Sequence, residues 1–238
     1  MECSLDEMKS ALEALNKRIE FALREANRAA GSVKLIWVSK FHPFEAVQNA
    51  ISLGATDFGE NRVQEAELKF ANRSPGIRCH VIGPVQSNKL RKACAVADCI
   101  HSISSLEQVQ KLDRIAGELG KALEVLFQVN VAEEETKSGL EPGQAEAFLN
   151  ALPEPRNLKY KGLMTIGRNT GVPEDSRECF AFLRKLRDKF LMRGGIFSEF
   201  TELSMGMTLD LEVAIEEGAT MIRVGTALFG ERDYSLKS

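Results

Sequence analysis

The first apolar positions of the chain recur every three or four residues, which predicts a long amphipathic helix within residues 1–30. The helix begins with Ser4 and Glu7 at the spacing of a capping box, in which each of the two residues hydrogen-bonds the backbone of the other. Apolar side chains then line one face as far as Leu23. We expect this face to pack against the body of the domain.

From Val33 onward, short apolar runs alternate with segments of helical spacing. A continuous apolar run is typical of a strand buried on both faces, as in a parallel sheet. The predicted strands are Val33–Val38, Thr56–Gly59, Cys79–Ile82, Cys99–Ser102, Val125–Val129, Leu158–Met164, Thr201–Leu203 and Met221–Val224. The predicted helices are Phe44–Leu53, Val63–Phe70, Ser87–Val96, Ser105–Leu119, one beginning near Pro142, Pro173–Arg193, Leu209–Glu217 and the last segment.

Strict alternation of strand and helix predicts an α/β protein with a parallel sheet. Eight such units in 238 residues have the size of a (β/α)8 barrel of the TIM type. A doubly wound open sheet is the alternative, because the pattern alone does not show closure. No linker rich in Gly, Ser or Pro divides the chain. We therefore expect a single domain over residues 1–238, with residues 1–30 as an extra N-terminal helix packed on the barrel.

Composition and charge exclude several classes of protein. The net charge of −3 gives no basic field for nucleic acid, and no apolar run is long enough to span a membrane. The polar N-terminus does not resemble a secretory signal. Five cysteines without metal-site spacing indicate reduced thiols in a cytoplasmic protein. No broad apolar stripe is left over, which favours a monomer. His42, His80 and His101 are scattered along the chain and predict neither a triad nor a metal site.

Lys40 is the first candidate for chemistry. It follows the buried run Leu35–Val38, and Pro43 then suits the first turn of a helix. We expect the Lys40 side chain to lie at the carboxyl end of a strand, where functional groups of such barrels gather. Partial burial there would lower the pKa of the amine and make it a better nucleophile toward an aldehyde. The simpler alternative is a lysine that extends along the surface at a strand end.

The loops after the seventh and eighth strands predict a phosphate site. Phosphate commonly binds between these two loops in barrels of this kind. Glycines permit close approach of the backbone, and hydroxyl groups and free N–H groups can bind the oxygens. Ser204 and Gly206 satisfy this description after the seventh strand, and Gly225 and Thr226 satisfy it after the eighth.

A lysine nucleophile and a phosphate site in one barrel suggest pyridoxal 5'-phosphate (PLP) as the cofactor. Lys40 would hold the aldehyde as a Schiff base, and Arg223 would lie near the pyridine nitrogen. A guanidinium can only donate hydrogen bonds, so the nitrogen would stay unprotonated and extensive carbanion chemistry is disfavoured. Asn61 and Met164, at the ends of the second and sixth strands, complete the predicted cofactor contacts.

Motifs from Val38 to Gly230 are similar to those of the YggS-like pyridoxal phosphate homeostasis proteins. They follow the family's order along nearly the whole chain. The matching segments are Val38–Lys40, Gly59–Asn61, Val63–Glu65, His80 with Ile82–Pro84, Gln86–Lys89, Lys137–Gly139, Gly162–Thr165, Leu203–Met207, Arg223–Thr226 and Phe229–Gly230. Arg62 departs from the pattern, since an aromatic residue is usual there, and so does the pair Phe41–His42, where smaller or more polar residues are common.

The resemblance implies a barrel of the alanine racemase N-terminal type, with PLP bound covalently to Lys40. It maps the family's phosphate contacts onto Ser204, Gly206, Gly225 and Thr226, and its ring-side arginine onto Arg223 in the eighth strand. It also implies a protein that holds PLP, keeps its free level in check and delivers it, with apo PLP-dependent enzymes as recipients and no established catalytic turnover.

Two enzymatic alternatives stay open at this point. An amino-acid racemase needs a second base opposite the lysine, and the only tyrosines are Tyr160, at the amino end of a strand, and Tyr234. A Schiff-base aldolase would use a lysine on a later strand, and Lys161 also lies at the amino end. We further expect that Lys137, in a polar loop, moves toward a bound phosphate.

Overall fold

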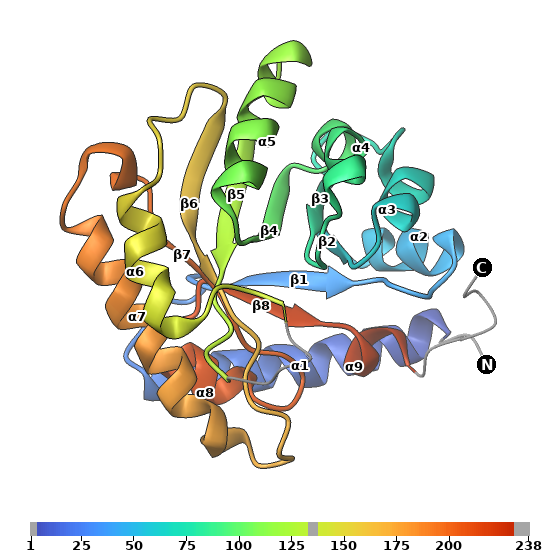
Figure 1. The fold of residues 1–238 in the computed structure, drawn as a ribbon. Coiled ribbons are helices and arrows are strands. Elements are labelled where there is room, and N and C mark those ends of the chain that lie inside the picture. The colour runs from blue at the N-terminus through green and yellow to red at the C-terminus, as the bar shows by residue number, and fades with distance from the viewer. Residues whose placement is uncertain (1–3, 133–137, 231–238) are drawn as a thin grey trace.

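The computed structural model describes residues 4–132 and 138–230. Eight parallel strands form one closed barrel in sequential order (Figure 1). The predicted (β/α)8 fold is therefore confirmed, and the open sheet is excluded. The strands are β1 Lys34–Val38, β2 Asp57–Glu60, β3 Arg78–Val81, β4 Cys99–Ile103, β5 Leu123–Gln128, β6 Leu158–Met164, β7 Glu202–Ser204 and β8 Met221–Val224.

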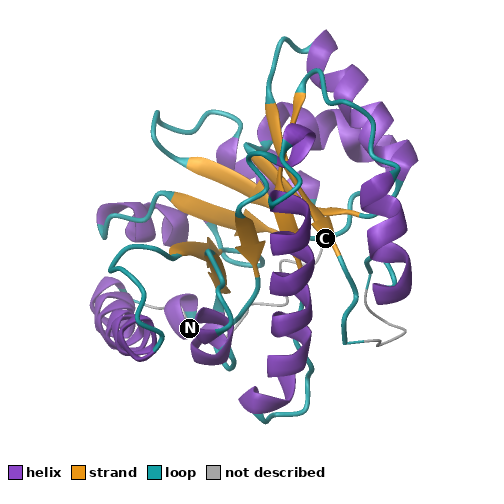
Figure 2. Ribbon diagram, turned by 90° about the vertical axis from the view of Figure 1, so that its left-hand side faces the viewer, coloured by secondary structure: helices purple, strands orange, loops and turns teal. Residues whose placement is uncertain are grey.

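The helices lie outside the strands (Figure 2) and cover the barrel. They are α1 Leu5–Glu25, α2 Phe44–Ser52, α3 Val63–Phe70, α4 Leu90–Val96, α5 Leu106–Glu118, α6 Pro142–Asn150, α7 Arg177–Leu191, α8 Leu211–Glu216 and α9 Thr226–Phe229. The predicted helices starting at Ser87 and Pro173 each open with a short 3-10 segment, Ser87–Lys89 and Pro173–Ser176, before the α-helix begins. Such tight turns are frequent at helix ends.

The extra N-terminal helix α1 forms as predicted and packs against α8 and α9. The Ser4 hydroxyl accepts the Glu7 N–H at 3.3 Å, and the Glu7 carboxylate accepts the Ser4 N–H at 2.8 Å. Arg18 binds the Glu212 carboxylate at 2.6 Å, which fixes the middle of α1 to α8. None of the helices in the described part of the chain is long and apolar enough to cross a membrane.

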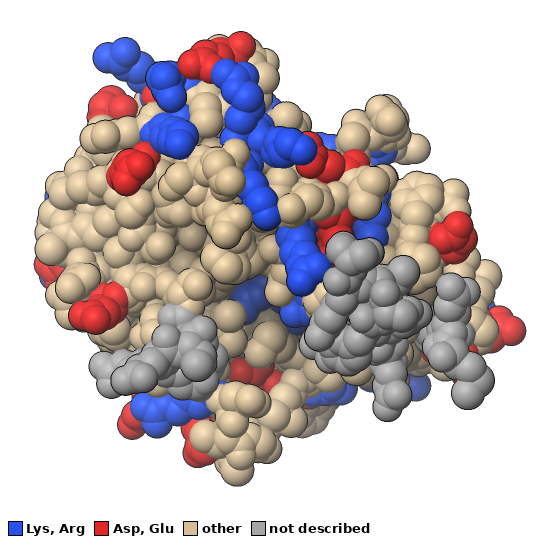
Figure 3. Space-filling view, turned by 45° about the vertical axis from the view of Figure 1, so that its right-hand side comes forward, with Lys and Arg blue, Asp and Glu red and all other residues tan. Residues whose placement is uncertain are grey.

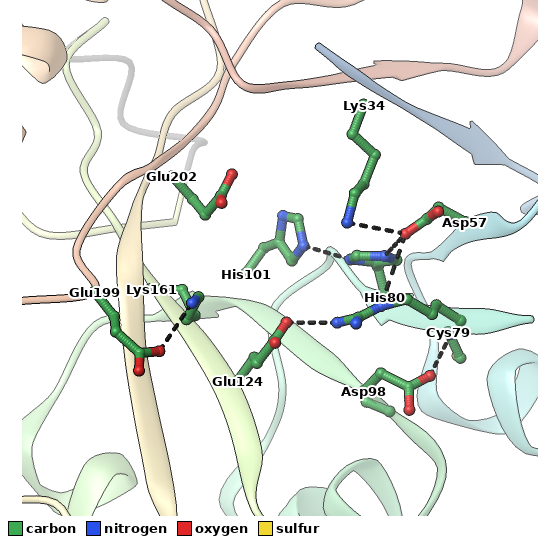
Figure 4. Close-up of polar contacts among 12 residues, drawn as sticks. Lys34, Asp57, Cys79, His80, Asp98, His101, Glu124, Lys161, Glu199 and Glu202 are labelled. Carbon is green, nitrogen blue, oxygen red and sulfur yellow. Dashed lines mark hydrogen bonds and ion pairs between the residues drawn. The ribbon is translucent and has the colours of Figure 1, made fainter. Parts of the chain in front are cut away.

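A β-bulge in β6 shifts the register between β5 and β6. Val125 pairs with Tyr160, but the next residue of β5 pairs with Gly162, which leaves Lys161 as the extra residue. Lys161 hydrogen-bonds Glu199 at 3.0 Å (Figure 4). Gly162 has a φ of +154°, and a Cβ atom there would lie 1.9 Å from the carbonyl oxygen of Glu202. Only glycine fits this position without a shift of β7.

We predict that Gly162→Ala destabilises the chain by about 2 kcal/mol or more, because the added methyl group collides with backbone that cannot move freely. Gly143→Ala is the matched control, since it lies in α6 and nothing stands within 4 Å of an added Cβ. The control should change stability by less than about 1 kcal/mol, in the stabilising direction. Urea unfolding measures both. Equal stability of the two variants would contradict this account of the bulge.

Candidate functional site

A cavity of about 650 Å³ opens at the carboxyl ends of the strands. This is the end at which barrels of this fold place their functional groups. Its described lining residues are Val38, Lys40, Asn61, Ile82, Gly83, Pro84, Gln128, Ser138, Met164, Ile166, Asn169, Met207, Thr208, Leu209, Arg223, Gly225 and Thr226. Six of the eight predicted cofactor contacts lie on this wall. Ser204 and Gly206 do not.

A larger hollow of about 820 Å³ lies elsewhere, between the end of α1 and the start of β1. Residues such as Asn16, Arg24 and Asn27 line it. It borders the amino end of β1, whereas the functional groups of such barrels come from the opposite end. The candidate site is therefore the smaller cavity.

Lys40 stands at the corner of a tight turn directly after β1. The turn closes where the His42 N–H donates to the Ser39 carbonyl oxygen at 3.1 Å. Phe41, the third residue of the turn, has a φ of +63°. Glycine is usual at that position, so a phenylalanine there is strained and must be held by its surroundings.

A buried polar network holds the two residues that flank Lys40. The Lys69 ammonium group donates to the Ser39 carbonyl oxygen and to the Glu60 carboxylate, each at 2.8 Å. The Ser39 hydroxyl also donates to Glu60, at 2.7 Å. The Phe41 N–H donates to the Glu65 carboxylate at 2.9 Å. Both neighbours of Lys40 are thus fixed by α3 and by the end of β2.

Burial raises the pKa of Glu60 to about 7, against the opposing effect of Lys69 and Ser39. Its second carboxylate oxygen has no hydrogen-bond partner in the described part of the chain. The side chain is fully buried. Glu60 therefore titrates near neutral pH, close to the turn that carries Lys40.

Arg223 is held rigidly in the wall of the cavity. One of its terminal nitrogens, Nη1, donates to the Ser204 hydroxyl at 2.7 Å, and the other, Nη2, donates to the Thr165 carbonyl oxygen at 2.8 Å. Burial lowers the pKa of Arg223 to about 10, and Asp210 opposes this effect. The guanidinium is still charged at neutral pH.

Ser204 and Gly206 do not line the cavity but hold residues that do. The Ser204 hydroxyl is fully buried and hydrogen-bonds His101 and Arg223. Gly206 has a φ of +91°, and a Cβ there would lie 2.5 Å from the Cβ of Ala214, so it lets the loop pack closely on α8. In the same loop, the residues that line the cavity are Met207, Thr208 and Leu209.

Two other glycines permit close approach at the cavity wall. A Cβ at Gly83 would lie 2.3 Å from the carbonyl oxygen of Asn61, and a Cβ at Gly225 would lie 3.0 Å from that of Val38. These glycines keep neighbouring strand ends together where a ligand would be enclosed.

Comparison with known proteins adds evidence to this geometry. Residues 12–233 match the family model for the alanine racemase N-terminal domain. The chain is 38% identical to the pyridoxal phosphate homeostasis protein of Vibrio cholerae over 231 residues, covering 94% of this chain and 96% of that protein. It is 40% identical to the protein of that name from Pseudomonas aeruginosa over 222 residues, covering 91% and 94%. The chain belongs to the pyridoxal phosphate homeostasis protein family.

Solved structures agree with this family. PipY of Synechococcus elongatus with PLP bound is 38% identical and superposes with a TM-score of 0.77, covering 90% of this chain and all of that one. An alanine racemase of Clostridium difficile superposes with a TM-score of 0.72 at 16% identity, covering 95% of this chain and 56% of that one, and shows the fold alone.

The two departures from the family's pattern contact each other, and the second also contacts α9. The Arg62 guanidinium lies 5.5 Å from the centre of the Phe41 ring, which is a cation–π contact. His42 stacks on Phe229 with ring centres 5.1 Å apart. Arg62 therefore covers the strained turn beside Lys40 in this member of the family.

Sequence reasoning missed several residues of the wall, including Thr208, Gln128 and Asn169. Thr208 had a signal, because it is a second hydroxyl in the loop after the seventh strand. Gln128 had a weaker one, since it is a polar residue at the end of an apolar run. The prediction for Lys137 lies outside the described residues.

His80 and His101 come together in the structure, which their positions in the sequence did not predict. His80 and His101 are 21 positions apart in the sequence, but their ring nitrogens lie 2.9 Å apart inside the barrel. The cause is the pairing of β3 with β4, in which His80 lies beside Cys99 and His101 follows two residues later on the same face.

We predict that Glu60→Gln makes stability less dependent on pH. The pKa of Glu60 is about 7 in the folded chain and near 4.5 in the unfolded chain. A carboxyl of this kind adds to the free energy of unfolding fully below pH 4.5, and this contribution is lost as the pH rises through about 7. Between pH 5.5 and 8 the unmodified chain should therefore lose on the order of 2 kcal/mol more stability than Glu60→Gln.

Urea unfolding at the two pH values measures this difference. Groups such as the histidines titrate in the unmodified chain and in Glu60→Gln alike, so their contributions cancel in the comparison. Glu67→Gln is the control, because Glu67 is a half-exposed residue of α3 and the change removes only a surface pair with Lys92. The control should follow the unmodified chain. A parallel pH profile for Glu60→Gln would show that Glu60 is ionised across this range.

Proposed function

We propose that this chain binds PLP in the cavity and holds it covalently on Lys40. The observation that carries the proposal is that a lysine and a fixed, charged arginine line one cavity with two glycine-containing strand ends. The Lys40 amine would attack the aldehyde and release water, which leaves a Schiff base. When bound, PLP supplies an electrophilic carbon and an electron-withdrawing ring.

We propose that the phosphate of PLP binds the part of the wall formed by Gly225, Thr226 and Thr208. Thr226 begins α9, and the first N–H groups of a helix have no acceptor within it. We propose Gly206 as the residue that shapes the opposing loop and Ser204 as a contact that acts through Arg223. Asn61, directly after β2, and Met164, the last residue of β6, would contact the ring.

The described wall favours holding PLP over chemistry on an amino acid. None of the described lining residues is a tyrosine, histidine or cysteine, and none carries a carboxylate, so Lys40 is the only one of them that could act as a base. A two-base racemase needs a second group that exchanges a proton, and Arg223 only donates hydrogen bonds. A guanidinium beside the pyridine nitrogen would also keep that nitrogen unprotonated and weaken the ring as an electron sink.

We propose a role in PLP homeostasis, in which the chain acts as a monomer in the cytoplasm and delivers PLP to apo PLP-dependent enzymes. PLP is an anion, and Lys and Arg side chains form a band that reaches the middle of one face (Figure 3). Arg62 and Lys89 follow closely on cavity residues in the sequence. A basic side chain next to Asn61 would speed the approach of the anion to the cavity.

The decisive prediction concerns Lys40. Addition of PLP to the purified chain should produce an imine absorption band with one equivalent bound. Borohydride reduction and peptide mapping should place the label on Lys40. Lys40→Ala should lose the band, and the control Lys92→Ala, at an exposed lysine, should keep it. A label spread over surface lysines, or no band, would overturn the proposal.

A second prediction separates delivery from turnover. The PLP-loaded chain should restore activity to an apo PLP-dependent enzyme, and it should not racemise or transaminate L-amino acids. Chiral chromatography and keto-acid assays measure the two reactions, and free PLP at equal concentration is the reference for delivery. Racemisation that disappears in Lys40→Ala would establish the enzymatic alternative.

A further inference from the structure

A continuous chain of hydrogen bonds crosses the interior of the barrel and ends at Arg223. Asp57 Oδ1 lies 2.9 Å from His80 Nε2, and His80 Nδ1 lies 2.9 Å from His101 Nε2. His101 Nδ1 lies 2.9 Å from the Ser204 hydroxyl, which accepts from Arg223 Nη1 at 2.7 Å. We call Asp57, His80, His101 and Ser204 the interior chain.

The interior chain connects the two ends of the barrel. Asp57 begins β2 at the amino end, where Lys34 lies 3.4 Å from its carboxylate (Figure 4). Arg223, near the end of β8, lines the cavity at the carboxyl end. His80 and His101 are fully buried between them. Four buried polar residues on four different strands are costly to place in a barrel interior unless every group is paired.

The charges fix which atom donates in each hydrogen bond. Although burial acts in the opposite direction, hydrogen bonds from His80 and Thr56 lower the pKa of Asp57, so its carboxylate is ionised and only accepts. Burial lowers the pKa of His80, and it lowers that of His101 to well below the ordinary value, so both rings are neutral.

One assignment of protons satisfies these conditions. His80 donates from Nε2 to Asp57, so its Nδ1 carries no proton and accepts from His101 Nε2. His101 Nδ1 then accepts from the Ser204 hydroxyl, and that hydroxyl accepts from Arg223. Every hydrogen bond points from the guanidinium toward the carboxylate. Opposite charges at the two ends polarise each bond in the same sense.

We propose that Asp57, His80 and His101 are positioning residues that, through Ser204, fix the orientation of the Arg223 guanidinium in the cavity wall. Loss of one member frees the Ser204 hydroxyl to turn, and Arg223 then keeps only the Thr165 carbonyl oxygen as a defined acceptor among these contacts. The effect on cofactor binding rests on the proposed function, whereas the proton assignment does not.

A metal site is the competing use of the same residues. Ligand atoms of His80, Cys99 and His101 lie within 4.8 Å of one another. A metal would need the proton of His101 Nε2 to leave and the Cys99 thiol to ionise. Burial raises the pKa of that thiol well above its usual value. The hydrogen bonds at 2.9 Å on all four ring nitrogens therefore favour the interior chain.

The first test is nitrogen-15 NMR of the ligand-free protein, which has only three histidines. His80 and His101 should both be neutral and carry the proton on Nε2 between pH 5.5 and 8. Asp57→Asn should shift the His101 nitrogens as well as those of His80, although His101 does not touch residue 57. A proton on Nδ1 of either ring, a doubly protonated ring at pH 7, or one equivalent of bound zinc would overturn the proposal.

The second test uses the PLP-loaded protein. His101→Leu should weaken PLP binding about tenfold and shift the absorption band and its pH profile, because Arg223 loses its fixed direction. His101→Gln, whose amide can both donate and accept, should restore part of the binding. Cys99→Ala, a buried neighbour outside the interior chain, should bind as the unmodified protein does.

The outcomes distinguish the two proposals. If the unmodified protein fails to bind PLP, the proposed function is wrong, and the NMR result still decides the proton assignment. If PLP binds and His101→Leu leaves the affinity and spectrum unchanged, the positioning role is wrong. Should His101→Leu fail to fold, the spectra of Asp57→Asn with PLP provide the same comparison.

Discussion

The pairing of β8 with β1 is the contact on which the candidate site depends. It joins Lys34 to Met221 and Trp37 to Val224, residues separated by nearly the whole chain. Ile36 pairs with Arg223, so the turn that carries Lys40 comes to lie beside the start of α9. In an open sheet these two strands would be edges. Closure therefore creates the cavity as well as burying the strands.

Much of this architecture follows from local features of the sequence. All eight predicted strands are present in the barrel. Apolar runs such as Leu35–Val38 and Val125–Val129 marked several of them, because strands of a closed parallel barrel are buried on both faces. Polar residues and glycines immediately after those runs marked the cavity wall, since strand ends are where a buried strand reaches solvent. Lys40, Asn61 and Gly225 were found in this way. Such residues are recognisable because they interrupt an apolar pattern.

The partners of buried polar side chains could not be predicted in the same way. Whether the Ser204 hydroxyl reaches the cavity or His101 depends on the register of the strands from β4 to β7, and that register shifts between β4 and β5 and again between β5 and β6. In the sequence, Lys69 is indistinguishable from an ordinary residue on the surface of a helix, although its ammonium group donates a hydrogen bond to the Ser39 carbonyl oxygen. Each of these contacts joins segments far apart in the sequence, and no local pattern specifies them.

The two buried polar systems act on different parts of the site. The network around Glu60 and Lys69 fixes the backbone on either side of Lys40, whereas the interior chain fixes the side chain of Arg223. Buried ionised groups add little net stability compared with well-packed apolar residues, so their use in both systems indicates a demand for orientation. Lys40 and the rigid donor Arg223 line the same cavity, so the two systems together provide a fixed place for a ligand. A fixed place of this kind is what the proposed retention of a cofactor requires.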